Sequence, residues 1–174
     1  MKIELLKEKQ NVVLMALHQL FENLEIMTDF SREAENHVAD MVVAEHRDVG
    51  LKGDEILGEY YFLPDKNEEQ DYQSMVFALT LMDDLKKEHM EDVIKAISVL
   101  NFILPKGAFV VDEDNGLLMY RYVASFPAEE SEEEMFSLAR FHIAFSVQLV
   151  SMWLDPLMTL AYGTITYEEF RKIV

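Results

Sequence analysis

The side chains best able to do chemistry in this sequence are a few histidines and a large excess of carboxylates. The histidines are His18, His37, His46, His89 and His142. Glu33 and His37 would lie one helical turn apart, but a metal site needs three or four converging ligands, and no further pair follows. The sequence therefore predicts no metal site, and we expect each histidine to be a surface or packed residue.

Nucleophilic and phosphate-binding motifs are absent from the sequence. There is no cysteine, which excludes disulfides, zinc–thiolate sites, iron–sulfur clusters and thiol nucleophiles. No serine stands in a G-x-S-x-G elbow, and the six glycines form no phosphate loop. We therefore expect a protein that is not an enzyme and carries no cofactor. The alternative is a small hydrolase or ligand-binding enzyme, which a pocket holding His142 beside a perturbed carboxylate would favour.

The charge balance narrows the classes of partner. The formal net charge is -18, from 33 acidic and 15 basic residues, which opposes binding to nucleic acid or to an anionic membrane surface. The most apolar stretch, residues 135–162, is interrupted by Arg140, His142 and Asp155-Pro156, so we expect a buried helix and no membrane insertion. A charged N-terminal segment and the lack of cysteine favour the cytoplasm.

Hydrophobic periodicity predicts the elements that position these residues. A 3.6-residue period predicts a helix over residues 3–26, and alternation or aromatic and β-branched content predicts strands over 38–46, 55–63 and 72–82. A second apolar stripe predicts a helix that ends before Pro105, with Asp83 and Asp84 in position to cap it.

The strongest local signal is a β-hairpin at Asn115-Gly116. This pair favours a two-residue type I′ turn, which would place Val111 opposite Tyr120 and Phe109 opposite Tyr122. Those side chains would share one face of the sheet.

A last helix follows the hairpin. Ser131 and Glu134 form a capping-box pattern, and the helix is predicted to stop or kink at Asp155-Pro156. Its inner stripe is expected to consist of Phe136, Ala139, Ile143, Val147, Val150 and Leu154.

The predicted order is helix, three strands, helix, two strands, helix, within one domain spanning residues 1–174. It predicts an α+β two-layer sandwich, in which helices cover one face of a mostly antiparallel five-stranded sheet.

Aromatic and methionine side chains are the candidate contacts for a partner. Methionine fills core gaps but also lines adaptable binding surfaces, and the chain has 11 of them. One of Tyr60 and Tyr61 must face away from the helices, and Trp153 falls beside the inner stripe of the last helix. Tyr61, Met152 and Trp153 are the predicted exposed protein contacts.

The second half of the chain resembles the YbjN family, whose fold is shared with type III secretion chaperones. The residues that carry the resemblance are Gly107, Phe109, Asp112, Gly116, Leu118, Tyr120, Arg121, Pro127, Ser131, Asp155-Pro156-Leu157 and Gly163. The resemblance implies a non-enzymatic protein that binds another protein, as type III chaperones bind an extended segment across apolar patches.

Taken together, these patterns favour a protein-binding module, chaperone-like or a regulatory adaptor, that is a homodimer. It would bury a partner's apolar side chains on the sheet or the last helix, within an acidic rim. A structural subunit of a larger assembly is the further alternative.

Overall fold

The computed structural model describes residues 3–32, 39–64 and 71–174. The elements in chain order are α1 (Ile3–Asn23), β1 (Thr28–Ser31), β2 (Met41–Val49), β3 (Asp54–Phe62), β4 (Tyr72–Met82), α2 (Lys87–Ile103), β5 (Ala108–Asp112), β6 (Leu117–Pro127), α3 (Glu132–Ala161) and α4 (Tyr167–Phe170). The Glu33–His37 pair and most of the predicted loop before Tyr72 lie outside the described residues.

The α+β class predicted from the sequence is confirmed, and the sheet is antiparallel. In the described part of the chain it has six strands, in the order β1-β2-β3-β4-β6-β5, one more than expected. The added strand is β1, a segment of four residues that pairs with β2 from Thr28↔Ala44 to Ser31↔Met41. Its sequence, TDFS, is too short and too polar to show a two-residue period.

Two compact units make up the chain. Unit 1 consists of Met1–His46, Gly58–Phe77 and Val123–Phe145, and unit 2 of Arg47–Leu57, Ala78–Tyr122 and Ser146–Val174. Four strands and α3 therefore contribute one stretch to each unit.

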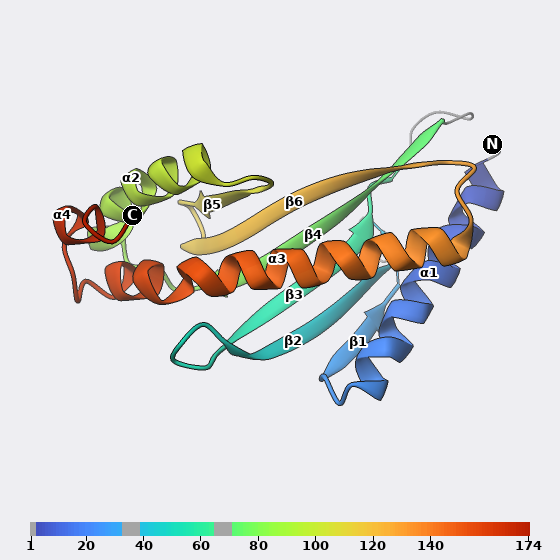
Figure 1. Ribbon diagram of the computed structural model, residues 1–174, viewed down its shortest axis with the longest axis horizontal. Coiled ribbons are helices and arrows are strands. Elements are labelled where there is room, and N and C mark those ends of the chain that lie inside the picture. Colours follow the sequence, from blue (N-terminus) through green and yellow to red (C-terminus); the bar gives the residue numbers. More distant parts are fainter. Residues whose placement is uncertain (1–2, 33–38, 65–70) are drawn as a thin grey trace. The chain divides into compact units, whose positions relative to one another are not determined.

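Unit 1 has helices on one face of its strands. Phe21 on α1 stacks on Tyr60 of β3, with ring centroids 5.8 Å apart, and Tyr60 contacts Phe77 of β4 at 6.1 Å. Phe77 in turn contacts the ring of His142 on α3 at 5.6 Å. Helix α1 also packs along β1 (Figure 1). The inward residues of β3 and β4 thus form one aromatic core beneath both helices.

Unit 2 contains α2, β5 and α4, and α2 contacts both β5 and α4 (Figure 1). Asn101 of α2 fixes the start of β5, because its amide donates to the Phe109 carbonyl at 2.9 Å and accepts from the Phe109 N–H at 2.8 Å. The Tyr120 hydroxyl donates to the Lys106 carbonyl at 2.9 Å. Burial raises the pKa of Tyr120 to about 12.

The hairpin exists, but its predicted turn and register are wrong. Val111 pairs with Leu118 and Phe109 with Tyr120, so the connection between β5 and β6 is the four-residue segment 113–116. Only Gly116 in this turn has a positive φ, of 66°. The carboxylate of Asp112 accepts the N–H groups of Asp114 and Asn115 at 3.1 and 3.2 Å, which stabilises the wider turn. The register moves by two residues, so every side chain keeps its predicted face.

The predicted cap of the second helix was also wrong, and of the stop or kink expected at Asp155-Pro156, the stop does not occur. Helix α2 begins after Lys86, which makes no side-chain cap, and Asp84 bonds to the Lys86 ammonium at 2.9 Å instead. Pro156 lies inside α3, which continues to Ala161. The helix ends where the N–H of Gly163, with a φ of 69°, bonds to the Leu160 carbonyl and that of Thr164 to the Thr159 carbonyl.

Candidate functional site

The predicted contact residues fall in both units. Tyr61 lies on β3 in unit 1 and is half-buried, on the face opposite to Tyr60. Met152 lies on α3 in unit 2 with 66% of its surface exposed, and Trp153 beside it is half-buried. Of the three residues, Met152 is therefore the one most accessible to a partner.

The outward side of α3 in unit 1 carries a cluster that sequence reasoning missed. It consists of Leu138, Phe141 and Phe145, which we call the α3 seam. Leu138 is 41% exposed and Phe141 58% exposed, and Phe145 is half-buried. The rings of Phe141 and Phe145 stack with centroids 6.2 Å apart and an interplanar angle of 26°. The seam is thus a continuous apolar strip over two helical turns.

The inner stripe expected for α3 concealed this seam. Ala139, Ile143, Val150 and Leu154 are buried as predicted, whereas Phe136 and Val147, predicted for the same stripe, are half-buried. Leu138, Phe141 and Phe145 recur at spacings of three and four on another side of it, and the same spacing continues in the sequence to Gln148 and Met152. That second 3–4 pattern was the signal available in the sequence.

Small side chains and one cation lie beside the seam. Ser137 and Ala144, one turn before and after Phe141, are exposed and leave its ring accessible. Arg140 is exposed, and its guanidinium lies 5.5 Å from the centre of the Phe136 ring. Arg140 is the one Lys or Arg in the sequence of α3.

Two neighbouring carboxylates, those of Glu130 and Glu134, lie at the N-terminal end of the seam. Glu134 lies one turn before Leu138, and the Ser131 hydroxyl donates to its carboxylate at 2.7 Å. That bond lowers the pKa of Glu134, whereas interaction with Glu134 raises the pKa of Glu130. The two carboxylates thus share one small region with the Lys9 ammonium, which donates to the main-chain carbonyls of Ala128 and Glu130 and partly offsets the rise in the pKa of Glu130.

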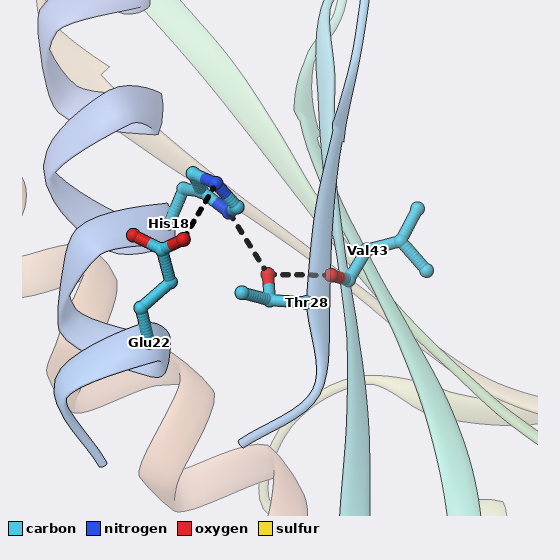
Figure 2. A network of polar contacts seen from close by, with 4 residues as sticks. All are labelled: His18, Glu22, Thr28 and Val43. Carbon is cyan, nitrogen blue, oxygen red and sulfur yellow. Dashed lines mark hydrogen bonds and ion pairs between the residues drawn. The ribbon is translucent and has the colours of Figure 1, made fainter. Parts of the chain in front are cut away.

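A carboxylate, an imidazole and a hydroxyl also line up in unit 1, as a hydrolase would require. Figure 2 shows His18 of α1 between Glu22 and Thr28, at 3.7 Å and 3.2 Å. The Thr28 hydroxyl donates its single proton to the Val43 carbonyl at 2.7 Å. It can therefore only accept from His18, whose Nδ1 must carry a proton. A catalytic base would instead take the proton from the hydroxyl. In this arrangement the hydrogen bonds of Thr28 connect α1 with β1 and β2.

The second buried polar pair is His46 with Tyr60. His46 Nε2 lies 2.6 Å from the Tyr60 hydroxyl, and the Phe21 ring packs against both side chains. Burial lowers the pKa of His46 to about 4 and raises the pKa of Tyr60 above its usual range. Both side chains are therefore neutral at pH 7, as a buried hydrogen-bonded pair in a core should be.

The residues named for the enzyme alternative do not converge in the described part of the chain. His142 lies among the rings of Phe77, Phe126 and Phe141, with centroids 5.6, 6.1 and 5.4 Å away. Among the described residues, the carboxyl groups with shifted pKa values lie at the surface and not in a pocket with His142: Glu91, Asp112, Glu134 and Glu169 are exposed, and Glu130 is half-buried. Within residues 3–32, 39–64 and 71–174, no group of three His, Asp or Glu side chains is arranged to hold a metal ion.

Helix α3 is long and apolar enough in composition to cross a membrane. Core helices of soluble proteins meet the same criteria, and 44% of its most apolar window is buried in the protein. Length and composition alone therefore do not distinguish the two cases.

Comparison with known proteins gives one structural similarity. No protein-family model matches the sequence, and no curated protein matches it significantly. The structure is similar to the crystal structure of YbjN from E. coli, proposed to be a transcription regulator, with a TM-score of 0.45 and 12% sequence identity over 86% of this chain and 92% of that one. At this level the similarity carries no argument about family or function.

Proposed function

We propose that this chain is a non-enzymatic, cytoplasmic protein-binding module, a chaperone-like or regulatory adaptor, whose contact surface is the α3 seam. The observation that carries the proposal is the exposure of Leu138 and Phe141 on a helix that is buried on its other side at Ala139 and Ile143. Leaving two large apolar side chains in water gives no folding benefit, because hydrophobic stabilisation requires burial. A cluster of such residues rimmed by polar groups is typical of an interaction site.

The composition of the seam supports this function. Aromatic residues are enriched in the centres of protein interfaces, where a few buried anchors provide most of the binding energy. Phe141 and Phe145 are already stacked on a rigid helix, so little side-chain freedom is lost when a partner covers them. Exposed Met152, farther along the same helix and in unit 2, offers an adaptable apolar contact of the kind expected from the sequence.

A crosslinking pull-down with paired variants tests the proposal. Phe141→Ser removes the central anchor, and Phe102→Ser, at a 90% exposed position near the end of α2, is the matched control. We expect the wild-type chain and Phe102→Ser to retain the same specific protein and Phe141→Ser to lose it. Equal retention by both variants would refute a role for the seam, provided that circular dichroism shows both to be folded.

A further inference from the structure

The seam has the geometry of a helix-binding surface. Leu138, Phe141 and Phe145 recur at spacings of three and four, and Glu134 precedes Leu138 by four residues in the same row. A straight row of this kind accepts the side chains of a second helix laid along it, whereas an extended strand, with a period of two residues, would not match it. The small residues Ser137 and Ala144 beside Phe141 allow a partner backbone to approach closely.

Charge determines which helix can lie there. The row begins at Glu134, which crowds Glu130, and from Met135 to Leu154 the sequence contains no carboxylate. The chain as a whole carries -18. A partner helix with Lys or Arg next to its apolar residues would place these cations beside Glu130 and Glu134. The negative charge of the whole protein would also attract it.

We infer that the occupant of the α3 seam is a basic amphipathic helix of a partner protein. Its apolar side chains cover Leu138, Phe141 and Phe145, and a Lys or Arg near one end pairs with Glu130 and Glu134. This inference rests on the proposed function and adds the chemistry of the partner.

A second copy of the chain fits this surface less well. Two copies would bring together two charges of -18, and the pair Glu130–Glu134 would meet the single Arg140 as its one basic match on α3. The homodimer expected from the sequence stays a prediction, and we expect any such dimer to leave the seam uncovered.

Binding of a designed peptide tests the inference directly. The probe is a labelled helical peptide of about 20 residues, with leucines at 3–4 spacing, lysines on its flanks and an arginine in its last turn. The matched peptide has glutamate at every basic position. Fluorescence anisotropy with the full chain gives the affinity of each peptide at low and at high salt.

Four variants identify the contacts. Phe141→Ser should weaken binding of the basic peptide by about tenfold or more, and Phe102→Ser should leave it unchanged. Glu130→Gln and Glu134→Gln, the latter preserving the capping pattern with Ser131, should each weaken binding a few-fold and reduce its salt dependence. The glutamate peptide should not bind measurably.

Three results would overturn the inference. The first is equal binding of the two peptides, and the second is peptide binding that Phe141→Ser does not change. The third is a wild-type dimer in light scattering that Phe141→Ser converts to a monomer, because this would assign the seam to a second copy. Failure here is distinct from failure of the proposed function. A partner captured through Phe141 that the basic peptide cannot displace would retain the function and reject this occupant.

Discussion

At the scale of single residues, two sets of polar side chains in unit 1 are hydrogen-bonded within the protein. His46 and Tyr60 hydrogen-bond to each other, and the hydroxyl of Thr28 is shared between His18 and a main-chain carbonyl. An unpaired polar group in such a core would cost about 1–3 kcal/mol. These hydrogen bonds therefore explain how histidine, threonine and tyrosine side chains can lie close together and stabilise the fold.

The burial of His46 predicts loss of stability in acid. The folded-state pKa of about 4 lies below the ordinary value of 6.5, so the unfolded chain binds the proton more tightly. Stability is full above pH 6.5 and is lost as the pH falls from there toward 4. This group alone should cost about 3 kcal/mol across that window.

Urea unfolding of the wild type and of His46→Gln, measured at intervals from pH 7 to acid, checks this sign. The variant should have a flatter profile in the window, because glutamine does not titrate. Identical slopes for the two proteins would show that His46 is not responsible.

Gly58 is expected to tolerate no side chain. A Cβ atom at this position would lie 2.4 Å from the Tyr60 hydroxyl and 2.9 Å from His46 Nε2. Gly58→Ala should therefore destabilise the protein by about 1–3 kcal/mol through overpacking. Denaturant unfolding measures the change, with Glu59→Ala on the opposite face as the control, and a neutral Gly58→Ala would contradict the packing described here.

At the scale of elements, a carboxylate of α3 fixes the turn between β2 and β3 within unit 2. Asp155 accepts the N–H groups of Leu51 and Lys52 at 2.7 and 3.2 Å, and Ser151 accepts that of Gly50 at 3.0 Å. The turn is thus held by its backbone, although the side chain of Leu51 is 98% exposed.

Asp155→Ala should release this turn. We expect a loss of about 1–3 kcal/mol, since main-chain donors lose a charged acceptor, and faster amide exchange at Leu51 and Lys52. Hydrogen exchange followed by NMR measures both effects. Gln148→Ala, at an exposed position of the same helix, should change neither. Unchanged amide exchange in Asp155→Ala would show that the turn is stable without the Asp155 carboxylate.

The elements also show what could be predicted from the sequence. Strand β4 begins and ends at the predicted residues, because its long apolar run is bounded by polar segments on both sides. The hairpin was located correctly, but its register depended on the Asp112 side chain, which stabilises a wider turn than Asn115-Gly116 alone favours. Local stereochemistry predicted a stop or a kink at Asp155-Pro156, yet the helix continues past Pro156, where Leu154 and Leu157 are buried.

The candidate site was only partly predictable for a related reason. Apolar periodicity predicted the inner stripe of α3, and the methionine content suggested Met152 as a contact, but a helix with apolar residues on two sides gives no sign of which one is covered. The pairing of Phe141 with Phe145 emerged only from the packing.

At the scale of the whole molecule, the net charge of -18 acts against compactness. Like charges repel one another more in the folded chain than in the expanded one. We therefore expect the melting temperature to rise as sodium chloride is added from low concentration to physiological ionic strength, where the screening length falls to about 8 Å. Calorimetry measures the rise, an uncharged osmolyte at equal osmolality is the control, and a melting temperature that falls with salt would contradict the expectation.

The order of the sheet has a final consequence, for aggregation. Its two outermost strands, β1 with four residues and β5 with five, are the shortest in the sheet. Each also contacts a helix, α1 in one unit and α2 in the other. Unpaired strand edges are templates for joining other chains, and short, covered edges restrict that pairing. A protein that keeps an apolar helix face open to partners is thereby protected against uncontrolled strand-to-strand growth.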